Sequence, residues 1–339
     1  VALSDTQDAA AVEEHPTPGS QPQRTGPGEG SRADEEATNA SGGAGGSMRP
    51  GPRVLDRYLV GRVIGKGGMA QVYRGLHERL ELPVALKVLS DNLTQDFMER
   101  VEREAKLMAR VRHANVVSVL DYGFLPDGRP CIAMELLAGN SLQSRLKEEG
   151  ALAWPVAVRF MIGILGGLEA LHREAILHRD LKPSNVVIIP GDPEEIKLID
   201  LGIAMPTHED SSKLTSAGVI LGTPAYMAPE QILSLPLDRT SDLYSAGLIL
   251  YKMLTGDPPF PEGRLSMVLK RIQIPVPRPE APADRPPLPA ALQKVVLEVL
   301  QVDQDHRIQT AALFRGRLEE VLRHDEGGAP RPAPVRRDQ

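Results

Sequence analysis

The pattern of apolar and polar positions changes along the chain. Residues 1 to 54 contain almost no large apolar side chains. From residue 57 onward, short alternating or continuous apolar runs predict β-strands at 57–64, 71–75, 83–89, 116–122 and 131–136. After Gly139 longer runs predict helices, the longest at 154–172, and short runs at 186–189 and 196–199 predict two more strands. We therefore expect an α+β protein with a strand-rich N-terminal part and a mainly helical C-terminal part.

One predicted helix carries a carboxylate on its apolar side. The segment from 94 to 112 has apolar residues at helical spacing, which define a core-facing stripe of Phe97, Val101, Met108 and Val111. Glu104 falls on this stripe, and a buried carboxylate is costly unless it is paired. Lys87, between apolar neighbours in the strand 83–89, is the partner that we expect. Glu99 and Glu102 lie off the stripe and are expected to be solvated.

Composition separates the two ends of the chain from its middle. Residues 1–50 contain three Arg against eight Asp and Glu, a net charge of −5 out of −6 for the chain, and are rich in Gly, Pro, Ala and Ser. Such a segment buries too little surface to fold, so we expect a disordered tail at 1–54 and a Pro/Arg-rich tail or linker at 325–339. The near-neutral remainder favours no nucleic-acid partner.

Cysteine and hydropathy patterns point to a cytoplasmic protein. The single cysteine, Cys131, lies in an apolar run and is expected to be a core strand residue; one thiol forms no internal disulfide. The N-terminus lacks the pattern of a secretory signal. The longest apolar stretch, 157–171, is interrupted by Arg159 and Glu169, so we expect an amphipathic helix and no membrane segment in this chain.

A glycine-rich stretch lies between the first two predicted strands. Gly65-Lys66-Gly67-Gly68-Met69-Ala70 lets the backbone approach a phosphate chain and direct N–H groups at its oxygens. The order strand–turn–strand argues against a dinucleotide-binding βαβ unit. Taken alone, the stretch is also compatible with an ordinary hairpin turn.

Further along, charged and amide groups gather around one predicted loop. His178-Arg179-Asp180-Leu181-Lys182-Pro183-Ser184-Asn185 lies between the helix 154–172 and the strand 186–189, and such a loop can fix charges accurately. Asp200 follows the strand 196–199 directly, where a carboxylate can hold a hard cation such as Mg²⁺.

These strings resemble one family. The 178–185 string resembles the catalytic loop of serine/threonine protein kinases. Three other strings agree with that resemblance: Val84-Ala85-Leu86-Lys87, Asp200-Leu201-Gly202, with Leu in place of the usual Phe, and Gly222-Thr223-Pro224-Ala225-Tyr226-Met227-Ala228-Pro229-Glu230. The glycine-rich stretch and the 222–230 string look most like bacterial Hanks-type kinases, although Ala70 replaces the third glycine of the usual pattern.

The resemblance implies a bilobal kinase fold over residues 55–324, with an N-lobe at 55–137 containing an antiparallel sheet and one helix, and a mainly helical C-lobe at 138–324. It implies that Asp180 orients the substrate hydroxyl and that Lys182 offsets charge on the transferring phosphoryl group. Asn185 and Asp200 would bind Mg²⁺, with Mn²⁺ as an alternative metal, and Lys87, held by Glu104, would meet the ATP phosphates.

The resemblance also implies a nucleotide slot. Its phosphates would lie under Gly65 and Gly67, and the hinge backbone from Glu135 to Leu137 would meet the adenine edge. Small apolar side chains would cover the ring, with Met134 at the gatekeeper position. The covering residues are Val72 and Ala85 on one face and Val187 on the other.

Regulatory and structural roles follow in the same way. Arg179 would bind a phosphate on the loop between Asp200 and Glu230, where Thr215 matches the activating threonine best, followed by Ser216 and Ser212. Met205 stands where a basic residue often assists. Among structural residues, Asp242 would brace the catalytic loop and Arg307 would pair with Glu230.

These features predict an active protein kinase that uses ATP, phosphorylates Ser and Thr of proteins and autophosphorylates its activation loop, in trans within a homodimer. Two alternatives remain: a nucleotide-binding pseudokinase scaffold and a small-molecule phosphotransferase of the same fold. The presence of Lys87, Glu104, Asp180, Asn185 and Asp200 argues against the first. The Ala-Pro-Glu segment argues against the second.

Overall fold

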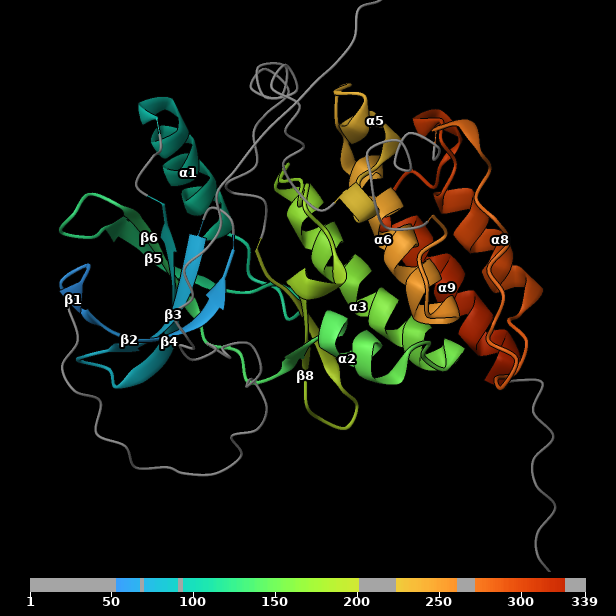
Figure 1. Ribbon diagram of the computed structural model, residues 1–339, viewed down its shortest axis with the longest axis horizontal. Helices are drawn as coiled ribbons and strands as arrows, with labels where there is room; N and C mark the ends of the chain where they lie inside the picture. The colour runs from blue at the N-terminus through green and yellow to red at the C-terminus, as the bar shows by residue number, and fades with distance from the viewer. Residues whose placement is uncertain (1–52, 68–69, 91–93, 201–223, 261–271, 327–339) are drawn as a thin grey trace, which may run out of the picture. The chain divides into compact units, whose positions relative to one another are not determined.

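The computed structural model describes residues 53–67, 70–90, 94–200, 224–260 and 272–326. The N-terminal part is a six-stranded antiparallel sheet in the order β1-β2-β3-β4-β6-β5, accompanied by the helix α1 (Figure 1). The elements are β1 (Arg53–Val54), β2 (Tyr58–Lys66), β3 (Ala70–His77), β4 (Leu82–Leu89), α1 (Gln95–Met108), β5 (Val119–Phe124) and β6 (Pro130–Glu135).

The C-terminal part is mainly helical and contains a small three-stranded sheet in the order β7-β8-β9. Its central helix, α3, packs against α6 and α9. The elements are β7 (Asn140–Ser141), α2 (Leu142–Glu149), α3 (Trp154–Arg173), β8 (Val186–Ile189), β9 (Glu195–Leu198), α5 (Pro229–Ile232), α6 (Arg239–Thr255), α8 (Ala290–Val299) and α9 (Ala311–Glu326). Three 3₁₀ turns lie at Pro183–Asn185, Pro224–Tyr226 and Gln304–His306. The expected α+β, bilobal architecture is confirmed.

The two faces of β4 contact different cores. Val84, Leu86 and Val88 belong to a small cluster on one side of the sheet, whereas Ala85 and Leu89 belong to the large core shared with α1 and the C-terminal helices. Because side chains alternate along a strand, Lys87 lies on the face of Ala85 and Leu89. The strand register therefore brings a lysine to the interior side of the sheet, where it is 9% exposed.

Helix α1 has the predicted apolar stripe. Val101 and Met108 are buried, and the side chain of Thr94 caps the helix by accepting a hydrogen bond from the Phe97 N–H. Cys131 is fully buried in β6, as predicted, and burial raises the pKa of its thiol to about 12.

The domain limits differ slightly from those predicted. β1 places Arg53 and Val54 in the sheet, and Val54 is buried, so the fold begins before the predicted start at residue 55. At the other end α9 continues to Glu326, past the predicted limit at 324. Both differences have one cause. Composition shows roughly where the tails give way to the domain, but it does not identify the first residue of the sheet or the last residue of the final helix.

Helix α3 is long and apolar enough to cross a membrane by length and composition alone, and 61% of its apolar window is buried inside the protein. Its fully buried residues include Met161, Ile164 and Leu168, which pack in the large core. A buried core helix passes the same test of length and hydropathy.

A buried ion pair fixes α5 to the C-terminal helices. Arg307 binds Glu230 through two parallel hydrogen bonds, Nη1 to Oε1 at 2.6 Å and Nη2 to Oε2 at 2.7 Å. The two side chains are 0% and 2% exposed, and the guanidinium also donates to the carbonyls of Gln301 and Val302 and lies over the Tyr244 ring. The predicted pairing is confirmed. It locks the start of α5 in place.

Because a buried carboxylate that loses its cation stays desolvated, Arg307→Met should lower the free energy of unfolding by about 3–5 kcal/mol. Urea unfolding at neutral pH measures this change, and Glu230→Gln combined with Arg307→Met should recover part of it. The half-exposed pair Arg315–Glu169 provides the control, since Arg315→Met should cost less than about 1 kcal/mol. A loss as small as the control's for Arg307→Met would contradict the prediction.

Candidate active site

The loop from His178 to Asn185 is held by one buried carboxylate on α6. Asp242 accepts hydrogen bonds from the backbone N–H of His178 and of Arg179, each at 2.9 Å, and from His172 Nε2 at 2.8 Å. Burial alone would raise the pKa of Asp242, but the hydrogen bond and charge of His172, together with the loop's donors, hold it below its usual value. The predicted brace is present, and His172 is a participant that sequence reasoning missed.

The loop turns sharply at Arg179. The Asp180 N–H donates to the His178 carbonyl at 2.7 Å, and Arg179 has a φ of 62°. This is a γ-turn, which is uncommon and strained for a residue with a side chain. The turn sets the direction in which the backbone presents Asp180.

Three predicted catalytic side chains meet just beyond this turn. Lys182 Nζ lies 2.7 Å from Asp180 Oδ2, and Asn185 Nδ2 donates to the Asp180 carbonyl at 2.8 Å and to Asp180 Oδ2 at 3.3 Å. The structure therefore brings together a partly exposed carboxylate, an ammonium group and an amide. A carboxylate so placed can accept or orient a hydroxyl proton, while the ammonium can offset nearby negative charge.

Asp200 lies next to this group. It follows β9 with a φ of 53°, and the intervening Ile199 N–H donates to the Asn185 carbonyl at 2.9 Å. Since Asn185 uses its Nδ2 to donate to Asp180, its Oδ1 remains to bind a cation. The described residues contain no cluster of three or more His, Cys, Asp or Glu that could hold a metal. A donor set of one carboxylate and one amide suits Mg²⁺, which takes few protein oxygens together with phosphates.

The predicted Lys87–Glu104 ion pair is wrong for this structure. Lys87 Nζ instead lies 2.9 Å from Asp200 Oδ1, and Glu104 Oε1 lies 3.4 Å from Arg179 Nη1. The reasoning that a half-buried carboxylate on α1 needs a cation was right, but the choice of cation was not. Arg179 comes from a loop far away in the sequence, and helical periodicity carries no information about it.

The environment of Glu104 disfavours its charged form. Burial is the largest cause and raises the pKa of this carboxyl to about 7, against the opposing positive charges of Arg179, Arg100 and Arg103. With its side chain 23% exposed, Glu104 therefore changes protonation near neutral pH.

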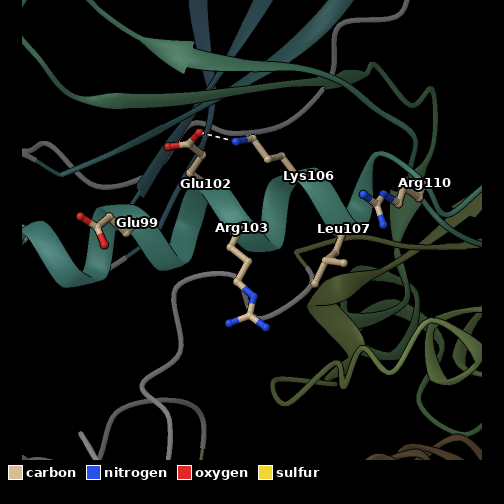
Figure 2. A pocket seen from close by; sticks show the side chains of 6 residues that line it. All are labelled: Glu99, Glu102, Arg103, Lys106, Leu107 and Arg110. Carbon is tan, nitrogen blue, oxygen red and sulfur yellow. Dashed lines mark hydrogen bonds and ion pairs between the residues drawn. The ribbon is translucent and has the colours of Figure 1, made fainter.

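A groove with a volume of about 390 Å³ lies along α1. Figure 2 shows the side chains that line it, which are Glu99, Glu102, Arg103, Lys106, Leu107 and Arg110. Glu102 pairs with Lys106 at 2.6 Å and its side chain is 41% exposed; Glu99 is also exposed. Both glutamates are solvated, as predicted, so Glu104 is the acidic residue that α1 contributes to the interior.

The strand register brings together the residues that are predicted to line the nucleotide slot on β2, β3, β4 and β6. Gly65 is paired with Val72 and Val72 with Lys87, and Ala85 is paired with Met134 one strand further on. Val187 is 9% exposed yet belongs to neither core cluster. An apolar side chain with so little exposure is compatible with the wall of a binding slot.

The side chain of Glu135, at the start of the predicted hinge, is held by two partners that the sequence analysis did not single out. Glu135 Oε1 accepts hydrogen bonds from the Ser118 N–H at 2.7 Å and from Lys197 Nζ at 2.8 Å. Burial opposes ionisation of Glu135, but Lys197 and the Ser118 N–H hold its pKa below the usual value. A Cβ on Gly139 would lie 2.1 Å from the Ile188 carbonyl oxygen, so the chain passes β8 here only as glycine. Leu137, between them, is partly buried.

The predicted phosphorylation sites Thr215, Ser216 and Ser212 lie outside the described residues, as does Met205. They remain predictions. Their expected partner, Arg179, is described and its side chain is 26% exposed.

Comparisons with known proteins agree on one family. A family model described as "Protein kinase domain" matches residues 58–324. The chain is 36% identical over 278 residues to the serine/threonine-protein kinase pkn3 of Myxococcus xanthus, covering 80% of this chain and 51% of that protein. It is 41% identical over 235 residues to the serine/threonine-protein kinase PknL of Mycobacterium tuberculosis, covering 68% and 57%.

A solved structure resembles the fold. The crystal structure of the Mycobacterium tuberculosis PknI kinase domain aligns with a TM-score of 0.63 and 26% identity, covering 81% of this chain and all of that one. The chain spans about half the length of the curated relatives it matches.

The raised pKa of Glu104 makes stability depend on pH in a defined window. In the unfolded chain this carboxyl loses its proton near its usual pKa of 4.5, whereas in the folded protein its pKa is about 7. Between these values the folded state binds more protons, so the Glu104 contribution to stability is lost as pH rises. Chemical denaturation at several pH values measures the free energy of unfolding. Between about pH 4.5 and 7 this free energy should fall less steeply with rising pH in Glu104→Gln than in the unaltered protein. The control is Glu99→Gln on the exposed side of α1. Identical slopes for Glu104→Gln and the unaltered protein would contradict the assignment.

Proposed function

Because this chain belongs to the protein kinase domain family, we propose that it is a serine/threonine protein kinase that transfers the γ-phosphoryl group of ATP to protein hydroxyls. The observation that carries the proposal is the meeting of Asp180, Lys182 and Asn185 within 2.7–3.3 Å, on a loop held by buried Asp242. Phosphoryl transfer depends mostly on positioning and electrostatics, and this arrangement supplies both.

In the proposed reaction a Ser or Thr hydroxyl oxygen forms a bond to the γ-phosphorus, the bond from that phosphorus to the bridging oxygen of ADP breaks, and ADP leaves. Asp180 orients the hydroxyl and accepts its proton, which then passes to solvent. Lys182 offsets negative charge on the transferring group.

Asn185 and Asp200 are the residues that would hold Mg²⁺, or Mn²⁺. The bound cation supplies charge neutralisation for the phosphates. Lys87, now paired with Asp200, is within reach of the same region and would bind the α- and β-phosphates.

The nucleotide itself would lie in the slot described above. The backbone around Gly65 and Gly67 would cover its phosphates, and the adenine would lie between Ala85 and Val72 on one side and Val187 on the other. Met134 would limit the depth of the slot, and the backbone at Glu135 and Leu137 would bind the adenine edge.

The choice of Ser and Thr rests on two observations. Lys182-Pro183-Ser184 is the form of this loop typical of serine/threonine kinases, and the relatives are named as such. We propose protein substrates, a cytoplasmic location for this chain, and trans-autophosphorylation between two copies.

Regulation would act through Arg179. This arginine now binds Glu104, and it is also the expected partner of a phosphate on Thr215, Ser216 or Ser212. Because a phosphate carries more negative charge than a carboxylate, phosphorylation would compete with Glu104 for the guanidinium. A displaced Glu104 would then be available to Lys87, the pairing that the sequence predicts.

Incubation of the purified chain with Mg²⁺ and ATP, followed by phosphosite mapping by mass spectrometry, tests the proposal. We expect phosphate on Thr215 or its neighbours and on a generic protein substrate, with the rate reduced at least about 100-fold in Asp180→Asn, because a positioned charge is lost. Asp127→Asn changes an exposed aspartate paired with Arg129 and should retain activity. No phosphate on either the unaltered chain or the substrate would favour the pseudokinase alternative.

A further inference from the structure

The γ-turn at Arg179 needs support on both sides. A non-glycine residue at positive φ is disfavoured, so the turn persists only where its surroundings hold it. Asp242 Oδ1 holds the N–H of Arg179 at 2.9 Å. The other side of the residue is the peptide group between Arg179 and Asp180, which carries the Arg179 carbonyl.

That carbonyl has a specific partner on α5. Gln231 Nε2 donates to the Arg179 oxygen at 2.7 Å. The bond therefore fixes the peptide plane from which Asp180 continues, whereas Asp242 fixes the plane before it. The two contacts together determine the orientation of the strained residue.

The orientation of the Gln231 amide is itself determined. Its Oε1 accepts a hydrogen bond from the Ala228 N–H at 2.8 Å, so a flipped amide would place oxygen against oxygen at Arg179 and nitrogen against N–H at Ala228. The neighbouring Glu230 is anchored by Arg307. The backbone next to Gln231 is therefore held in place, and only one orientation of the Gln231 side-chain amide satisfies both hydrogen bonds.

We propose that Gln231 is a positioning residue for catalysis, which acts through the Arg179 carbonyl to keep the Asp180 carboxylate beside Lys182 and Asn185. This inference rests on the proposed kinase function. Gln231 touches neither substrate nor the reacting atoms in this proposal. Its role is to connect α5 to the catalytic loop.

The two hydrogen bonds, to the Arg179 carbonyl and from the Ala228 N–H, require an amide side chain of this length. Glutamate has the same shape and keeps an oxygen for the Ala228 N–H, but as a carboxylate it cannot donate to the Arg179 carbonyl. Methionine has a similar length and can make neither bond. Gln231→Glu therefore loses only the contact with the Arg179 carbonyl, whereas Gln231→Met also loses the contact with Ala228 at the start of α5. A defect shared by both variants arises at the Arg179 carbonyl, and a defect seen only in Gln231→Met arises at α5.

Steady-state kinetics of Gln231→Glu and Gln231→Met, with ATP and a generic protein substrate, test the proposal. We expect kcat to fall about tenfold in both variants, because the partly buried Arg179 carbonyl loses its donor, while the KM for ATP stays within about twofold. The control is Gln301→Glu, which removes a hydrogen bond from a glutamine to the Leu297 carbonyl and should leave kcat unchanged. Wild-type kcat in Gln231→Glu, with a loss only in Gln231→Met, would overturn the proposal.

Amide hydrogen exchange over residues 177–182 gives a second measurement that needs no activity. The Asp180 N–H should exchange faster in both Gln231 variants than in the unaltered chain, with melting temperatures still close to that of the unaltered chain. Unchanged exchange there would refute the positioning role. An inactive unaltered chain would instead count against the proposed function, and the exchange measurement would still decide the role of Gln231.

Discussion

The site depends on a carboxylate that has been removed from water. Asp242 is 2% exposed, and its burial is tolerated because three donors surround it: two consecutive backbone N–H groups of the loop and the imidazole of His172. Hydrogen bonds to a charged acceptor are roughly twice as strong as neutral ones. This energy offsets the strain of the positive φ at Arg179, and the strained turn in turn directs Asp180 towards Lys182 and Asn185. A buried charge on one helix thereby determines the geometry of the neighbouring loop.

Two ion pairs beside this loop involve residues from other elements. Lys87 binds Asp200, and Arg179 binds Glu104. Each cation also has a second expected partner, a nucleotide phosphate for Lys87 and a loop phosphate for Arg179. Because a cation shared between two anions favours the more highly charged one, a loop phosphate at Arg179 would compete with Glu104, and a nucleotide phosphate at Lys87 would compete with Asp200. The half-buried Glu104, with its pKa raised to about 7, is the least firmly held of these residues.

Much of this arrangement could be predicted from the sequence, and the limits are physical. Periodicity located the strands and helices, since burial of alternate or every third to fourth residue is a local property. The strings at 178–185 and 222–230 located the catalytic loop and the Glu230–Arg307 pair by resemblance. The partner of Glu104 could not be found in this way, because two cations lie within reach and only the three-dimensional placement of α1 distinguishes them. Gln231 and Lys197 also escaped notice, since a glutamine or lysine that binds a distant backbone or side chain has no local signature.

The chain's single cysteine has a practical consequence. Cys131 is fully buried in β6, and a thiol whose pKa is raised to about 12 has almost no reactive thiolate at neutral pH. Cysteines introduced at exposed positions of α1 and α9 would therefore accept maleimide dyes or spin labels without removal of the native residue. Distances between two such probes would report movement of α1 relative to the C-terminal helices in solution.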